Sequence, residues 1–225
     1  MKKLLLLSVC AIFFSASLFA QISKKEKKEK KKEKKEIIED LKTKAIKEAR
    51  KEEKRLVKEG FKVIPGGLPM AKQLENIWIM QSEKNDEGIV KYLVATGNGV
   101  AKTQTAAKLQ AIEIAKLEMA GKIETNVAAL IDGSVANKQL TAKEAESLTE
   151  VTSASTALIS QSLIGIKTPL EIMKDVGKEN VEVQVKILCD SDMSEKKAKK
   201  AILEELKKKT EIAHDKLDRI MGLTK

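Results

Sequence analysis

The chain is poor in the residue types from which most chemical sites are built. Its 225 residues include one histidine, two cysteines and three prolines, and only 3% are aromatic. A metal centre needs several ligands at a suitable spacing, but His214 and Cys189 fall in different predicted elements. We therefore predict no metal site and no cofactor, and a core built mainly from aliphatic side chains and alanine.

The first twenty residues have the three parts of a secretory signal peptide. Lys2 and Lys3 precede an apolar run from Leu4 to about Phe14, and small residues end at Ala20. The run is shorter than the roughly 20 apolar residues that a membrane-spanning helix needs. We expect cleavage after Ala20 and a location in the periplasm or at the outer membrane, with peripheral rather than transmembrane attachment.

The few cysteines also limit the covalent chemistry. Cys10 lies in "LLSVC", which departs from a lipoprotein signal because Val9 stands where a small residue is expected. The alternatives to cleavage at Ala20 are a cleavage site nearby, a retained signal segment that anchors the chain, and lipidation of Cys10. After cleavage Cys189 is the one cysteine left, so no intramolecular disulfide forms. We interpret Cys189 as a buried apolar side chain rather than a reactive thiol.

What the chain has in abundance is lysine, concentrated in "SKKEKKEKKKEKKE" from residue 23 to 36, within a chain of net charge +10. This run has nothing to bury, so it is a solvated spacer or an electrostatic contact with an anionic partner. Nucleic acid is disfavoured because no aromatic residues are interleaved with the lysines. The candidate contact residues are Lys24, Lys25, Lys27, Lys28, Lys30, Lys31, Lys32, Lys34 and Lys35.

The spacing of apolar residues divides the rest of the chain. The helix predicted over residues 36–58 is expected to pack through one face, because it has a thin apolar stripe of Ile38, Leu41, Ala45, Ala49 and Leu56. We predict a signal peptide over 1–20, a Lys/Glu-rich helical arm over 21–60, a linker with short elements over 61–90, a core domain over 91–190 and a C-terminal amphipathic helix over 191–225. Trp78, in the linker region, is interpreted as a packing anchor.

Within the core region, "IVKYLVATGNGVA" predicts a strand, and a wide apolar face predicts a helix from Thr103 to about Ile131. Thr141 and Glu144 form a capping box that opens a helix over 142–155. Period-two patterns on both sides of "VGKEN" predict a hairpin over 163–189, with Pro169 marking an edge or a bulge. A second capping box, Asp192 with Glu195, opens the last helix. The fold class is α+β: a small antiparallel sheet of about three strands packed by helices, with a long charged N-terminal helix and a C-terminal helix.

The stretch "GNGVAKT", from Gly97 to Thr103, superficially resembles a phosphate-binding loop. The dinucleotide fingerprint needs a third glycine where this chain has Lys102, and the P-loop needs glycine where it has Ala101. Both departures occur where backbone amides must approach a phosphate. At the end of the predicted strand, Gly97 and Gly99 allow a bulge or a close approach of another element. We interpret them as part of a strand-to-helix turn in which glycine supplies backbone freedom.

Catalysis is also disfavoured. The serines between Ser147 and Ser162 have one histidine to share, His214, which we place on the solvated side of the last helix. Paired carboxylates remain a route to acid and base chemistry, but the sequence singles out no pair. We predict that the protein is not an enzyme.

The block "YLVATGNGVAKTQTAAKLQAIEIAKLEMAGKIETNV" resembles the LPP-twenty type of bacterial envelope lipoprotein domain. The shared pattern is a strand ending in Gly-x-Gly, an alanine-rich helix and a hairpin, and it covers residues 92–190. The ensemble of motifs is also similar to uncharacterised exported proteins of the Bacteroides type. The resemblance implies an envelope-associated α+β module without a catalytic or cofactor-binding set.

These observations lead to one hypothesis and one alternative. The hypothesis is an exported, non-enzymatic envelope protein whose lysine run makes a salt-sensitive peripheral contact with an anionic surface or an envelope protein partner. The alternative is a small-ligand or peptide-binding module of the periplasm or outer membrane that uses a groove between the sheet and the helices.

Overall fold

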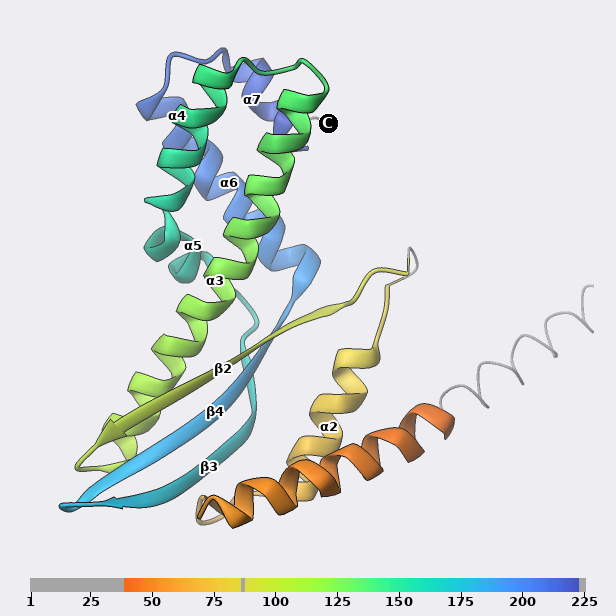
Figure 1. The fold of residues 1–225 in the computed structure, drawn as a ribbon, viewed down its shortest axis with the longest axis vertical. Helices are drawn as coiled ribbons and strands as arrows, with labels where there is room; N and C mark the ends of the chain where they lie inside the picture. The colour runs from red at the N-terminus through yellow and green to blue at the C-terminus, as the bar shows by residue number, and fades with distance from the viewer. Residues whose placement is uncertain (1–38, 86–87, 223–225) are drawn as a thin grey trace, which may run out of the picture. The chain divides into compact units, whose positions relative to one another are not determined.

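The computed structural model describes residues 39–85 and 88–222. One compact unit spans Ala45–Lys225, and residues 39–44, which are helical, belong to a separate unit. The predicted signal peptide and the lysine run from Lys24 to Lys35 lie outside the described residues. The compact unit has an α+β fold, as the sequence predicts, with helices packed on an antiparallel sheet (Figure 1).

The sheet has four strands, not about three, in the order β1-β3-β4-β2, and each neighbouring pair is antiparallel. The sequence missed β1 because two residues are too few to show a period-two pattern. β1 pairs with β3 through Lys62 and Val63. The strands are β1 (Lys62–Val63), β2 (Tyr92–Ala101), β3 (Lys167–Gly177) and β4 (Asn180–Asp190).

The predicted hairpin is confirmed by β3 and β4. Its turn has two non-glycine residues, Lys178 and Glu179, in the left-handed region, with φ of 52° and 59°. Positive φ at both central residues is the mark of the tight two-residue hairpin turn, whose twist matches that of the strands. The pairing with β4 shifts register between Lys167 and Leu170, beside Pro169, so the prediction of a bulge at Pro169 is confirmed.

The central helix, α3, runs over Gln104–Ala136, five residues beyond its predicted end. The Thr103 hydroxyl accepts a hydrogen bond from the Ala106 amide and so caps its start. The first half of α3 lies on β2 and β4, and its second half extends beyond the sheet, where α4 to α7 surround it (Figure 1). These helices are α4 (Ala142–Ser153), α5 (Thr156–Ser162), α6 (Ser191–Lys209) and α7 (His214–Ile220).

The sequence predicted the presence of these helices better than it predicted their ends. The capping box of Thr141 and Glu144 is present at the start of α4. The predicted box of Asp192 and Glu195 is wrong, because α6 starts two residues earlier, where the Asp190 carboxylate accepts a hydrogen bond from the Met193 amide. The last helix is also two helices, since α6 ends at Lys209 and α7 begins at His214.

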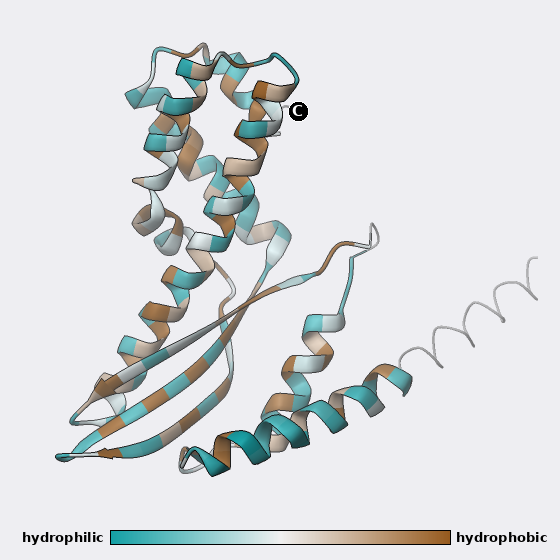
Figure 2. Cartoon of the chain, viewed as in Figure 1, coloured by the Kyte–Doolittle hydropathy of each residue, from teal (hydrophilic) through white to brown (hydrophobic). Residues whose placement is uncertain are grey.

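The sheet is packed on both faces, which we call the α3 face and the α2 face. On the α3 face, α3 covers every second residue of β4 from Val183 to Cys189, and hydrophilic and hydrophobic residues alternate along the strand (Figure 2). On the α2 face, α2 (Met70–Ser82) and helical residues 45–58 cover Leu170, Ile172 and Leu188.

Residues 61–90, predicted to be mainly a linker, therefore supply part of the core. Phe61, Leu74 and Ile77 are buried with the strand residues of the α2 face. The packing prediction for residues 36–58 is confirmed in part: Ala45, Ala49 and Leu56 are buried, but Leu41 is 36% exposed. Ile38 lies outside the described residues. Trp78 is not the anchor that the sequence suggested, since it lies on the outer side of α2 with 37% of its surface exposed.

Candidate functional site

The Gly-x-Gly segment lies inside β2, not in a turn. Gly97 pairs with Val185 and Gly99 with Val183 on β4. A Cβ atom on Gly97 would lie 1.9 Å from the carbonyl oxygen of Ala111, and one on Gly99 would lie 2.1 Å from that of Ala107. The glycines therefore allow the backbone of α3 to touch the strand. The predicted role in a strand-to-helix turn is wrong, whereas the close approach that the sequence allowed at Gly97 and Gly99 is confirmed.

Side chains of α3 also occupy the outer edge of β2. The Thr96 amide donates to the Glu118 carboxylate at 2.9 Å, and the Val100 amide donates to the Gln110 side chain at the same distance. The Lys122 ammonium donates to the Val94 carbonyl at 2.5 Å. An edge strand normally offers such groups to another strand. Here α3 satisfies them, so this edge is closed to strand addition at these three positions.

A cleft of about 380 Å³ lies at the opposite side of the sheet, between α2, β3 and the turn that follows β1. We call it the Gln73 cleft. Gln73 lies at its base and is buried, with its amide oxygen 2.9 Å from the Glu171 amide and its amide nitrogen 2.6 Å from the Leu68 carbonyl. The lining residues are Ile64, Pro65, Gly66, Gly67, Leu68, Gln73, Asn76, Thr168, Pro169 and Glu171.

The turn beside this cleft has a specific conformation. The Gly67 amide donates to the Ile64 carbonyl at 2.9 Å, and Gly66 has a φ of 83°. Proline followed by glycine with positive φ is typical of a type II turn. This "IPGGLP" segment, residues 64–69, falls in the predicted linker, and its turn forms one wall of the cleft.

A second cleft, of about 620 Å³, lies between the start of α4 and the loop from α6 to α7. Two of its charged groups, Glu144 and Lys216, pair with each other. The Glu144 carboxylate accepts from Lys216 at 2.6 Å and from the Thr141 amide at 2.8 Å. The Lys216 ammonium and the Thr141 donors lower the pKa of Glu144 to about 2. Glu144 is therefore a fixed anion in its capping box and not a proton donor at neutral pH.

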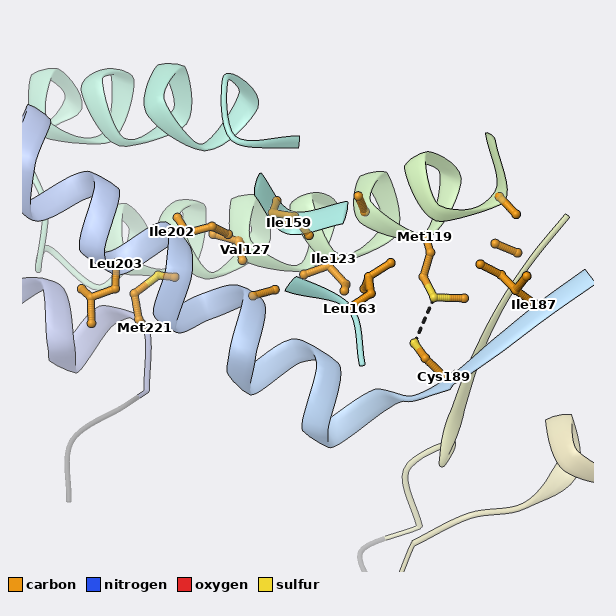
Figure 3. Packing of buried hydrophobic residues seen from close by; sticks show 14 of the residues in the cluster. Met119, Ile123, Val127, Ile159, Leu163, Ile187, Cys189, Ile202, Leu203 and Met221 are labelled. Atoms are coloured by element: carbon orange, nitrogen blue, oxygen red, sulfur yellow. Dashed lines mark hydrogen bonds between the residues drawn. The ribbon is translucent and has the colours of Figure 1, made fainter. Parts of the chain in front are cut away.

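The other two candidate reactive groups are Cys189 and His214. Cys189 is buried on the α3 face, and its thiol donates to the Met119 sulfur at 2.9 Å (Figure 3). Burial raises the pKa of this thiol, so the nucleophilic thiolate is disfavoured. His214 is exposed at the start of α7, as predicted. Within residues 39–85 and 88–222, no three His, Cys, Asp or Glu side chains are grouped to hold a metal ion.

The packing around Cys189 explains why its thiol is buried. Met119 and Ile123 of α3 lie over the thiol, and the same core continues through Val127 to Ile159 of α5 and Ile202 of α6 (Figure 3). The prediction that Cys189 is a buried apolar side chain is therefore confirmed.

The nine lysines predicted to contact an anionic partner lie outside the described residues, so the structure does not place them. Sequence reasoning missed the Gln73 cleft, because its walls come from segments about a hundred residues apart. Among the described helices, none combines the length and hydrophobicity needed to cross a bilayer. No family model, characterised protein or solved structure matches the chain.

Proposed function

We propose that the protein is an exported, non-enzymatic component of the bacterial envelope that makes a peripheral contact with an anionic surface through its lysine run. Lys24, Lys25, Lys27, Lys28, Lys30, Lys31, Lys32, Lys34 and Lys35 act together in this contact. The proposal rests on the leader-like first twenty residues and on the distribution of charge along the chain.

The distribution of charge is the observation that carries the proposal. Residues 24–35 contain nine lysines and three glutamates, a net charge of +6, in a chain whose net charge is +10. Lys2 and Lys3 of the predicted signal account for a further two charges. The remaining residues, including the whole compact unit, are therefore close to electrical balance.

In the compact unit many lysines are engaged by carboxylates of other elements. Lys186 of β4 is 2.7 Å from Glu52, and Lys108 of α3 is 2.8 Å from Glu171 of β3. Such pairing leaves the lysine run as the concentrated source of positive charge. Each basic residue near an anionic membrane adds roughly 1 kcal/mol of binding free energy, so several acting together suffice for peripheral attachment without a fixed structure.

Fractionation of the producing cell tests the location and the mode of attachment. We expect the protein in the membrane pellet at low salt and in the supernatant after a high-salt wash, because salt screens surface charges within about 10 Å at 0.1 M. Release by detergent alone would contradict peripheral attachment and point to lipidation at Cys10 or to a retained signal. Recovery in the soluble fraction at low salt would make the run a spacer.

A charge-matched pair of variants tests the lysines directly. We expect replacement of all nine by glutamine to abolish binding to vesicles that contain anionic lipid, and replacement by arginine to preserve it. Neither variant should change the thermal unfolding of the compact unit, because the replaced residues precede it. Equal vesicle binding by the glutamine and arginine variants would overturn the proposal.

A further inference from the structure

The Gln73 cleft exists because β1 stops early. After Val63 the chain turns away at Pro65 and Gly66, so β1 pairs with β3 at Ile172 and Met173. On this side, β3 before Ile172 faces the cleft and has no strand among the described residues beside it. The cleft is thus a gap at the edge of the sheet, walled by α2 and the turn.

Regular strand addition does not suit this gap. Pro169 has no amide hydrogen to donate to a neighbouring strand. The next available donor, the Glu171 amide, is already bound to the Gln73 side chain at 2.9 Å. Whatever occupies the cleft is therefore recognised by side chains and by the shape of the walls rather than by a continuous ladder of hydrogen bonds.

Two polar side chains in the cleft are free to bind. Asn76 of α2 and Thr168 of β3 line it from opposite walls, and neither side chain hydrogen-bonds to any residue that the structure describes. An asparagine amide has two donor hydrogens and one acceptor oxygen, and threonine has a hydroxyl that does both. A peptide group, which also has one donor and one acceptor, is complementary to the asparagine amide.

The remaining walls indicate a neutral ligand of modest size. Ile64, Leu68 and Pro169 are apolar, and the one charged lining residue, Glu171, is paired with Lys108 at 2.8 Å. Among the described lining residues there is no free cation to favour phosphate or carboxylate, and no aromatic side chain on which a sugar or base could stack. The volume of about 380 Å³ falls at the lower end of the range for ligand sites.

We propose that the Gln73 cleft binds a short, extended, uncharged peptide segment, with Asn76 pairing with a main-chain amide and Thr168 fixing the neighbouring group. Gln73 is a positioning residue in this site: it holds the Leu68 carbonyl and the Glu171 amide and so sets the distance between the walls. The site is separate from the lysine run, so each of the two proposals stands without the other.

Titration of the full exported chain with acetyl-tetraalanine amide, followed by amide NMR, tests the site. We expect saturable shifts at Gly66, Gly67, Gln73 and the Asn76 side chain. Asn76→Leu keeps the size of the side chain but removes both hydrogen-bonding functions, so we expect binding to weaken about tenfold. Gln81→Leu changes an exposed amide of α2 that does not line the cleft and should bind as the wild type does.

Several outcomes would overturn the proposal. These are non-saturable shifts, shifts confined to the cleft between α4 and α7, or equal binding by Asn76→Leu and Gln81→Leu. Saturation at the same residues by N-acetylglucosamine, with none by the peptide, would overturn the ligand class. Thr168→Val provides a second test should Asn76→Leu unfold. Replacement of the nine lysines by glutamine should leave the peptide shifts unchanged, which separates this site from the proposed membrane contact.

Discussion

The two faces of the sheet are packed by opposite means. On the α3 face the contact is between backbones: Gly97 and Gly99 leave no side chain, and Ala107 and Ala111 of α3 lie directly against them. On the α2 face the contact is between large side chains such as Leu74. An ion pair joins helix and strand on each face: Lys108 with Glu171 on the α3 face, and Lys186 with Glu52 on the α2 face.

The difference shows that the two faces of one sheet can be packed by different kinds of contact: backbone against backbone on one face, and large side chains on the other. Small residues bring α3 close enough for its side chains to reach the edge amides of β2, whereas larger side chains fill the contact with α2. The cleft between α2 and β3 lies beside this second kind of contact. The site that we propose for peptides therefore lies on the face with the side-chain contact, and the sealed edge lies on the face with the backbone contact.

We expect the largest loss of folding stability from the addition of one methyl group on the α3 face. We expect Gly97→Ala to cost more than about 4 kcal/mol, because its Cβ would lie 1.9 Å from the Ala111 carbonyl oxygen and a helix backbone cannot move locally. Urea unfolding measures the loss. Gly121→Ala is the matched control: the same change within α3, with no atom near the added Cβ.

This control should have the opposite sign. We expect Gly121→Ala to stabilise the protein by about 0.5–1 kcal/mol, since alanine is the better helix former. A Gly97→Ala protein as stable as the wild type would show that α3 and β2 are not in backbone contact.

On the α2 face, we expect the loss of a buried side chain to lower stability, as the addition of a methyl group does on the α3 face. Leu74 is fully buried in α2, and we expect Leu74→Ala to cost about 3 kcal/mol through lost burial and the cavity left behind. Leu109→Ala is the control, because Leu109 is 61% exposed on α3, and it should change stability by less than about 0.5 kcal/mol. Equal losses for the two variants in thermal unfolding would contradict this packing.

The smallest expected effect concerns acid and the helices beyond the sheet. The pKa of Glu144 is lowered from 4.5 to about 2 in the folded protein, so its contribution to stability is present above pH 4.5 and lost as pH falls toward 2. We expect Glu144→Gln to be slightly less stable than the wild type at pH 7, with the difference vanishing near pH 2. Urea unfolding at a series of pH values measures it, and a constant difference would contradict the pKa shift.

Hydrogen exchange of backbone amides at low pH can compare the opening of helices α4 and α7 with the opening of the sheet. Since Glu144 and Lys216 join α4 to α7, we expect these helices to open before the strands do. Simultaneous opening of α4, α7 and both faces would show that the helices and the sheet are one cooperative unit.

Much of the fold was predictable because its signals are local. The capping box of Thr141 and Glu144, the hairpin of β3 and β4 and the burial of Cys189 follow from side chains near one another in the sequence or from simple periodicity. The failures also have a physical cause. β1 is a strand only because β3 is beside it, and Trp78 stays at the surface because α2 buries a different stripe.

The candidate sites divide in the same way. The charge of residues 24–35 is a property of composition, so the sequence by itself determined it. The sequence also determined the α+β class and the positions of most helices and strands. The sequence allowed a bulge, a close approach or a turn at Gly97 and Gly99, and only the tertiary structure decided among these roles and placed Gln73 in a cleft. Their roles depend on the distance between backbones and on groups far away in the chain, and neither quantity is present in local sequence spacing.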